Sequence, residues 1–285
     1  MNDTQHNPYV GPRTFRTDER NLFFGREREA LDLLSLVISE RLVLFYAQSG
    51  AGKSSLINTK VIPGLLAEEE YKILPVGRVG SAESESELNV DNIYVYNLIN
   101  SLLPHDIRQD VLSRLTLTKF LSDSKTGENK RLKQVLIIDQ FEELFSTHRD
   151  AWEKRKDFFM QLAQALQADP SLWVVLVMRE DYLAYIDPYV YLLPNGLRVR
   201  YYMQRLERAA ALKAIKEPVK DSRPYAEGVA EKLVDDLRSV RIQGLNGKPI
   251  IQPGQYVEPV QLQVVCSSLE KITSRWFSNH PRACR

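Results

Sequence analysis

Residues 41–58, RLVLFYAQSGAGKSSLIN, constrain the fold of this chain more than any other stretch. They join a short apolar run at 42–46 to a loop of small residues and then to a Lys-Ser pair. An apolar run of this length that ends in a turn is typical of a buried parallel strand. The loop from Ala47 to Ser54 fits the pattern G-x-x-x-x-G-K-[ST] at every fixed position except the first, where alanine replaces glycine.

This loop predicts a phosphate-binding site, because small residues let backbone N–H groups approach phosphate oxygens closely. Lys53 supplies a positive charge, the Ser54 hydroxyl suits a magnesium ion, and the helix that starts near Lys53 adds its positive dipole end. The expected phosphate contacts are Ser49, Gly50, Ala51, Gly52, Lys53, Ser54 and Ser55. The simpler alternative is a glycine-containing turn with an exposed lysine. Alanine disfavours a positive φ, so Ala47 predicts a loop start shaped differently from the glycine form.

The segment before the first expected helix carries a second signal. Phe24, Gly25 and Arg26 directly precede residues 30–38, whose apolar side chains recur at helical spacing. Aromatic and backbone groups of this kind suit the base of a nucleotide, and a phosphate loop nearby favours that interpretation. The alternative is a helix start that packs its own small hydrophobic cluster.

Acidic residues follow the apolar run at 135–138. An acid such as Asp139, at the carboxyl end of a buried parallel strand, lies where α/β proteins bind ligands and where phosphate-loop hydrolases hold magnesium. Glu142 and Glu143 follow, and a carboxylate there could orient the water that attacks the γ-phosphate. Asp139 could instead serve only as the N-cap of a short helix.

The apolar run at 173–178 ends at Arg179. A guanidinium at the end of this strand could contact the γ-phosphate and stabilise charge during phosphoryl transfer. The alternative is an ion pair with Glu180 or Asp181, which follow directly in the sequence.

Strands alternate with helices over the first two thirds of the chain, which predicts a parallel sheet with helices on both faces. The expected strands lie at 42–46, 72–79 at a sheet edge, 135–138, 173–178 and 198–203, and the expected helices between them lie at 53–67, 92–102, 107–121 and 152–167. After Leu206 no strand pattern remains, and three helical patterns follow at 206–215, 229–240 and 260–272. We therefore predict a nucleotide-binding domain at 1–204, beginning with an extended arm at 1–21. A helical lid domain follows at 205–285, and we expect the chain to be cut before further domains.

The charge and the cysteine content limit which partners and which cellular compartment are expected. A formal net charge of +1 over 285 residues provides no global field that would attract nucleic acid or an anionic membrane. Cys266 and Cys284 form no metal-binding spacing and favour a reducing compartment. No apolar run reaches the length of a membrane helix, and the N-terminus lacks a signal core. We therefore expect a cytoplasmic protein without a membrane partner, and nucleic acid is not an expected partner of this segment.

Taken together, these motifs resemble the STAND class of signal-transduction nucleoside triphosphatases, in particular the branch called novel STAND NTPase 1. The resemblance spans nearly the whole chain and rests on NPYVGPRTF, FFGRERE, SGAGKSSL, VLIIDQFEELF, the strand that ends at Arg179, and EPVQLQVVC. It implies an α/β fold with a three-layer, five-stranded, AAA+-like phosphate-loop domain, followed by a small all-α lid or winged-helix-like domain.

The resemblance also implies roles for individual residues. Phe24, Gly25 and Arg26 would lie against adenine, with Pro259 of the helical part contacting the base from the other side. Arg179 would sense the γ-phosphate.

The order of the acids resembles related NACHT proteins, in which a second acid lies three residues after the first. This similarity favours Glu142 for positioning water, with Glu143 as the second candidate. Ala47 and Gln140, which replaces a glutamate of typical AAA+ ATPases, predict slow turnover.

The function implied is that of a switch that binds ATP or ADP with Mg²⁺. ATP would favour an open, self-oligomerising form and ADP a closed one, while sensor and effector domains outside this segment would supply trigger and output. Many bacterial members are thought to serve defence or stress signalling. Two alternatives stay open: a structural nucleotide-binding module without turnover, and a DNA-associated ATPase of the AAA+ type.

Overall fold

The computed structural model describes residues 7–80, 90–103, 114–125, 131–243 and 249–279. The chain divides into two compact units, which are described separately. The sheet unit consists of Leu31–Gln48 and Val61–Met203, and the loop unit of Met1–Ala30, Ser49–Lys60 and Gln204–Arg285. The domain boundary expected after residue 204 stays a prediction.

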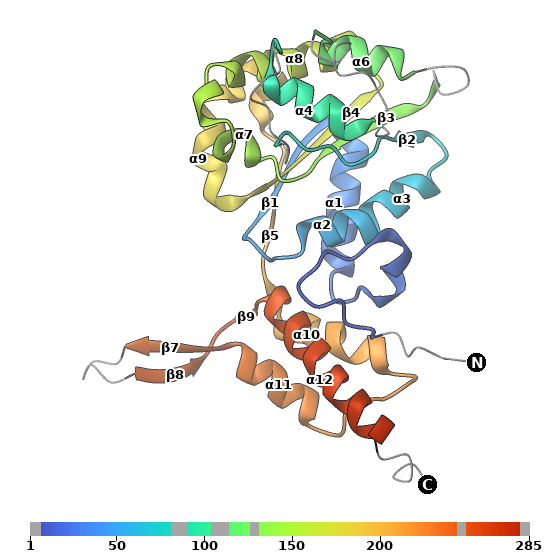
Figure 1. Ribbon diagram of the computed structural model, residues 1–285, viewed down its shortest axis with the longest axis vertical. Helices are drawn as coiled ribbons and strands as arrows, with labels where there is room; N and C mark the ends of the chain where they lie inside the picture. Colours follow the sequence, from blue (N-terminus) through green and yellow to red (C-terminus); the bar gives the residue numbers. More distant parts are fainter. Residues whose placement is uncertain (1–6, 81–89, 104–113, 126–130, 244–248, 280–285) are drawn as a thin grey trace. The chain divides into compact units, whose positions relative to one another are not determined.

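The sheet unit contains a parallel sheet of five strands in the order β2-β3-β4-β1-β5 (Figure 1). The strands are β1 (Leu42–Ala47), β2 (Tyr71–Ile73), β3 (Lys133–Ile138), β4 (Leu172–Arg179) and β5 (Arg200–Met203). The predicted five-stranded parallel sheet is thus confirmed, including the edge position of β2. This strand is shorter than the expected 72–79 because Pro75 cannot donate to a ladder, although Gly77 N–H still bonds Ile137 O at 2.8 Å.

Helices pack on this sheet through the side chains that alternate along its strands. The helices are α1 (Glu27–Ser39, which begins in the loop unit), α3 (Ile62–Ala67), α4 (Ile93–Leu102), α6 (Leu117–Asp123), α7 (Glu143–Ser146), α8 (Lys154–Ala168) and α9 (Leu183–Ile186). Leu44, Leu136 and Leu176 point to one face and join a hydrophobic cluster with residues of α4, α6 and α8. The alternate residues Phe45 and Ile137 are also fully buried, so both faces of the sheet are covered.

The register brings the carboxyl ends of the central strands to one edge of the sheet. Ala47, the last residue of β1, pairs with Arg179 of β4 and with Met203 of β5. On the other side of β4, Ile138 pairs with Leu176, and Asp139 follows directly. Asp139 and Arg179 therefore lie at the edge where α/β proteins bind ligands.

The loop unit combines the N-terminal arm, the phosphate loop and the C-terminal helices. Its elements are the 3-10 helix η1 (Thr17–Leu22), α2 (Lys53–Leu56), β6 (Leu206–Glu207), α10 (Arg208–Lys216), α11 (Val229–Leu237), β7 (Ser239–Gln243), β8 (Pro249–Pro253), β9 (Tyr256–Val257) and α12 (Pro259–Asn279). Tyr9 of the arm joins the core of α10, α11 and α12 together with Ile215, Val234 and Cys266. The arm therefore packs as part of this core.

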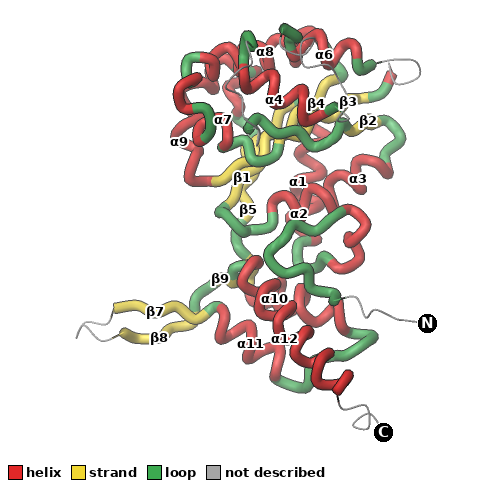
Figure 2. Tube along the Cα trace, viewed as in Figure 1, coloured by secondary structure: helices red, strands yellow, loops and turns green. Residues whose placement is uncertain are grey.

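The expectation of no strands after Leu206 is wrong. Two antiparallel pairs occur there, β6 with β9 and β7 with β8, drawn in yellow beside the red helices in Figure 2. β6 and β9 have two residues each, too few to show a period of two. Every residue of β8 is exposed, so its sequence lacks an apolar alternation, and two prolines bracket it. The all-α description of this part is corrected accordingly, and α11 ends at Leu237 rather than at 240.

Parts of some expected elements lie outside the described residues. Much of the helix expected at 107–121 lies outside them, and its remainder is α6 with Thr116 as its N-cap. The helix expected at 53–67 is confirmed as α2 and α3, which a π-helical turn at Ile57–Val61 connects. Within the described part of the chain, no helix is long and apolar enough to span a bilayer.

Candidate nucleotide-binding site

The phosphate loop has the backbone conformation that its glycines permit. Gly50 and Gly52 have φ values of 73° and 95°, in the left-handed region that favours glycine, and α2 begins at Lys53 directly after them. Ala47 lies at the end of β1 with both neighbouring strands paired to it, and its φ is not positive. Alanine at the first motif position therefore continues the strand.

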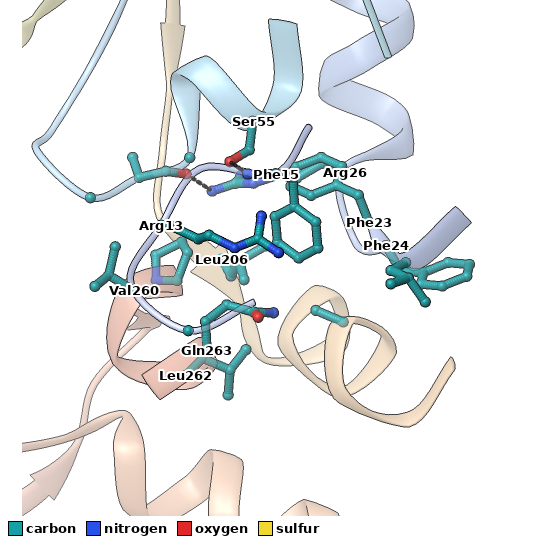
Figure 3. A pocket seen from close by; sticks show the side chains of 17 residues that line it. Arg13, Phe15, Phe23, Phe24, Arg26, Ser55, Leu206, Val260, Leu262 and Gln263 are labelled. Carbon is teal, nitrogen blue, oxygen red and sulfur yellow. Dashed lines mark hydrogen bonds between the residues drawn. The ribbon is translucent and has the colours of Figure 1, made fainter. Parts of the chain in front are cut away.

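A cavity in the loop unit connects the phosphate loop with the predicted base-binding residues (Figure 3). It encloses about 550 Å³, counting the part open to solvent. The loop and its helix contribute Gly50, Ala51, Gly52 and Ser55, while Phe24, Arg26 and Pro259 come from the two segments predicted to contact the base. Ser49, Gly25, Lys53 and Ser54 do not line this cavity. Lys53 and Ser54 begin α2 and are half-buried.

Arg26 is hydrogen-bonded to the backbone of the phosphate loop. Its guanidinium is 3% exposed, and its Nη2 donates to Ala51 O at 3.2 Å and to Gln204 O at 2.8 Å. Nη1 forms an ion pair with Glu29 in the first turn of α1. Since one guanidinium nitrogen bonds both the Ala51 and the Gln204 carbonyls, Arg26 joins the phosphate loop to the segment before β6 and thereby acts on the loop's shape.

Gly25 permits a close approach between the segment before α1 and helix α10. It has φ +83°, and a Cβ atom there would lie 2.3 Å from Ala210 O. Its N–H donates to the Glu27 carboxylate at 3.1 Å. A side chain at residue 25 would therefore displace α10, which carries the cavity residue Ala214.

Several further cavity residues were not among the predicted site residues, and three of them carry polar groups or bind the arm to the loop: Arg13, Phe15 and Gln263. The arm motif NPYVGPRTF contributed to the family resemblance, but its residue types and spacing do not by themselves predict contact with a nucleotide. In the structure, Phe15 N–H donates to Ser55 Oγ at 3.2 Å, and Asn58 Nδ2 donates to Phe15 O at 3.1 Å. The arm is thus hydrogen-bonded to the helix that follows the phosphate loop.

In the sheet unit, the acids after β3 have distinct partners. Asp139 is 8% exposed, and its Oδ1 accepts the N–H of Gln140, a non-glycine residue with φ 52°. Glu142 Oε2 accepts the N–H of Arg179 at 3.1 Å, which links the ends of β3 and β4. A residue held in the left-handed region at such a position is a form of strain that is often found at functional sites.

Glu143 is engaged by an arginine that follows β2. Arg78 forms an ion pair with its carboxylate and also donates to Gln140 Oε1, while Gly80 N–H donates to Glu143 Oε2 at 3.1 Å. Burial lowers the pKa of Arg78, but the Glu143 carboxylate more than offsets this, so the pKa lies above its ordinary value. The Glu143 carboxylate is therefore already bound by a guanidinium and by a backbone N–H.

Arg179 forms the ion pair considered as its alternative role. Its Nη2 donates to Asp181 Oδ2 at 2.6 Å, and its guanidinium lies 5.9 Å from the centre of the Tyr182 ring. The hydrogen bond that Arg179 donates to the Asp181 carboxylate raises the pKa of Arg179 above its ordinary value. With 41% of its side chain exposed, this arginine can exchange Asp181 for an anionic ligand.

The donor groups present suit magnesium bound together with phosphates. Ser54 offers a hydroxyl and Asp139 a carboxylate, and oxygen ligands of this kind are those that Mg²⁺ uses when phosphates complete its shell. Among the residues that the structure describes, no group of three or more His, Cys, Asp and Glu could hold a metal alone.

Comparisons with known proteins agree with this architecture. The Walker-type ATPase of Pyrococcus abyssi has 14% identity and a TM-score of 0.60 over 93% of this chain and 72% of its own. The ORC2 protein of Aeropyrum pernix, in its ADPNP-ADP and ADP forms, has 13% and 12% identity with TM-scores of 0.54 and 0.56, over 98% of this chain and 67% of its own. No curated protein sequence matches the chain.

The strand order and these similarities thus show a fold of the phosphate-loop, AAA+-like type. A family profile described as novel STAND NTPase 1 matches residues 8–248, and the chain belongs to that family.

Proposed function

We propose that this chain is the ATP-binding and slowly hydrolysing switch module of a signal-transduction NTPase. One observation carries the proposal: the loop glycines, the aromatic segment before α1 and the first residue of α12, Pro259, line a single cavity. A nucleotide with its phosphates at the loop would therefore also contact the helical part of the same unit.

The phosphate end is assigned from the motif and the sheet register. Backbone N–H groups at Gly50–Ser54 and the Lys53 ammonium would bind the phosphates, and Arg179 would contact the γ-phosphate. Ser54 and Asp139 would hold Mg²⁺, which neutralises phosphate charge when bound. The register supports this assignment, because the strand before the loop ends beside Arg179, and β3 and β1 both flank β4.

Hydrolysis would use Glu142 as the acid that orients water. In the reaction, water oxygen bonds to the γ-phosphorus, the bond to the β–γ bridging oxygen breaks, and the proton of the water passes to the Glu142 carboxylate. Glu142 also holds the Arg179 N–H, and Glu143 is tied to Arg78. These contacts support a slow reaction, because each carboxylate already binds a protein group and is not reserved for the attacking water.

The switch would act through α12. Because Pro259 begins this helix and lines the cavity, occupancy of the cavity biases the position that α12 adopts. Self-oligomerisation with ATP bound, and a role in bacterial defence or stress signalling, are extensions of this proposal from the family.

Nucleotide binding by purified protein tests the proposal. Titration with a fluorescent ATP analogue is expected to show saturable binding that Lys53→Ala abolishes and that the control Lys60→Ala, two helical turns further along, leaves intact. Phosphate release should be slow but measurable and absent in Lys53→Ala. Equal binding by wild type and Lys53→Ala would refute the proposal, and binding without any phosphate release would favour a structural nucleotide module.

A further inference from the structure

The N-terminal arm crosses the loop unit from α12 to the helix after the phosphate loop. At one end, Asn7 Nδ2 donates to Ser267 O at 3.2 Å and Val10 N–H donates to Gln263 Oε1 at 3.1 Å. At the other end, Phe15 bonds Ser55 and Asn58 through its backbone. The arm segment between these anchors, which contains Gly11 and Arg13, therefore lies along the cavity.

Arg13 is held in a fixed plane by a buried carboxylate. Its Nη1 and Nη2 donate to Glu19 Oε2 and Oε1 at 2.7 and 2.5 Å, which is the two-pronged geometry that a guanidinium and a carboxylate favour. Glu19 is only 5% exposed and also accepts the Arg16 N–H. The Arg13 side chain itself is 45% exposed, so part of it remains accessible from the cavity.

The cavity walls around Arg13 are apolar and aromatic. The rings of Phe15 and Phe23 pack edge to face with centres 5.2 Å apart, and Leu206 and Leu262 line the same space (Figure 3). Gln263 contributes its amide, whose oxygen already accepts the Val10 N–H, so its NH₂ group is left as the donor. Apolar walls with a few donors suit a flat ring that carries acceptor nitrogens.

We propose that Arg13, clamped by Glu19, contacts the purine base of the bound nucleotide and helps to determine its recognition. This inference rests on the proposed function, because it requires a nucleotide whose phosphates lie at the phosphate loop. The phosphates are expected at the start of α2, so the apolar part of the cavity receives the base. Arg13 Nη1 donates to Glu19 and to Thr14 O, and Nη2 donates once to Glu19. The guanidinium therefore offers the base its flat face for stacking and the N–H groups that these bonds leave over.

The test separates contacts to the base from contacts to the phosphates. Displacement of a fluorescent ATP analogue is measured with ATP and with inorganic tripolyphosphate, both with Mg²⁺. The main variant is Arg13→Lys, which keeps a cation beside Glu19 but loses the planar fork. Arg13→Gln/Glu19→Gln is the second variant, because it leaves no unpaired buried charge. Arg16→Ala is the matched control, since Arg16 also lies near Glu19, at 3.7 Å, but does not line the cavity.

We expect Arg13→Lys and the double variant to weaken ATP binding about tenfold, the effect of losing one charge-assisted contact. Tripolyphosphate binding should stay unchanged, and Arg16→Ala should behave as wild type. Unchanged ATP affinity in both Arg13 variants, or an equal loss for tripolyphosphate, would overturn the inference. If the Arg13 variants give that result while wild type binds ATP and Lys53→Ala does not, only the role of Arg13 is refuted and the proposed function stands. If wild type binds no nucleotide, the proposed function fails first.

Discussion

Ala47 and Arg179 are register partners at the carboxyl ends of β1 and β4, two neighbouring parallel strands. The phosphate loop leaves the sheet after Ala47, so it starts beside the arginine assigned to the γ-phosphate. Glu142 accepts the N–H of the same arginine, which brings the candidate water-orienting acid to this edge as well. This relationship is the structural basis of the proposed reaction.

Substitution of the two acids should separate their roles. Glu142→Gln is expected to lower the rate of phosphate release about 100-fold or more while ATP binding persists, because the amide cannot accept the proton of the attacking water. Glu143→Gln is the matched control, and it should change the rate less than tenfold, since Arg78 already occupies this carboxylate. Steady-state phosphate release and nucleotide titration measure both. A larger loss in Glu143→Gln than in Glu142→Gln would reverse the assignment.

Gly25 should tolerate no side chain. Gly25→Ala places a Cβ 2.3 Å from Ala210 O at a positive φ, and we expect a loss of more than about 3 kcal/mol in the free energy of unfolding. Gly228→Ala is the control, because Gly228 has φ +77° and open space around it, so backbone strain alone costs about 1–2 kcal/mol. Denaturant unfolding compares the two. Equal losses of stability in the two variants would show that α10 does not pack closely enough against residue 25 to exclude a side chain.

The Arg13–Glu19 pair predicts a dependence of stability on pH. The hydrogen bond from Arg13 lowers the pKa of Glu19 from 4.5 to about 2. Between these values the unfolded state binds the proton and the folded state does not, so the stabilisation is present above about pH 4.5 and is lost as pH falls towards 2.

Unfolding experiments on wild type and Glu19→Gln between pH 2 and 7 test this dependence. The difference in the free energy of unfolding between them should be largest near pH 7 and should shrink below pH 4.5. Other carboxylates titrate alike in both proteins and cancel in this comparison. A difference that does not change with pH would contradict the assigned pairing.

Cys266 should be unreactive in the folded protein. Burial raises the pKa of its thiol to about 11, so at pH 8 only about one thiol in a thousand is ionised, and the side chain is fully buried. A Cys284→Ser variant leaves Cys266 as the one thiol for reaction with Ellman's reagent. Labelling is expected only at the rate of unfolding, and at once in denaturant. Immediate labelling of the native protein would show that the core around Tyr9 and Cys266 opens readily.

The central strands and their site residues were predictable because their sequences carry strong local signals. β1, β3 and β4 each contain a continuous apolar run, which a loop or a charged residue follows directly. Such runs predict buried parallel strands, and the residue after each run is placed at the carboxyl edge by topology alone. The positions of Ala47, Asp139 and Arg179 follow from that pattern.

The cavity wall formed by the arm was not predictable in the same way. Val10 and Gln263 are bonded across 253 positions of sequence, and Phe15 and Ser55 across 40. No local sequence period encodes contacts between residues so far apart. In the sequence, Arg13 and Phe15 were therefore recognisable only as part of a motif shared with the family. Likewise, the short pair β6 and β9 forms because Leu206 and Val257 are buried in one core, which no two-residue pattern reveals.

The most direct test of the central claim is the effect of Asp139→Asn on the magnesium dependence of ATP binding, measured by calorimetry with Mg²⁺ and with a chelator. Wild type should bind ATP at least about tenfold more tightly with Mg²⁺, and Asp139→Asn should lose most of that gain while keeping its affinity for metal-free ATP. If Asp139→Asn kept the full magnesium-dependent gain, the carboxylate after β3 would not act on the nucleotide held by the phosphate loop, and the proposed site would be wrong.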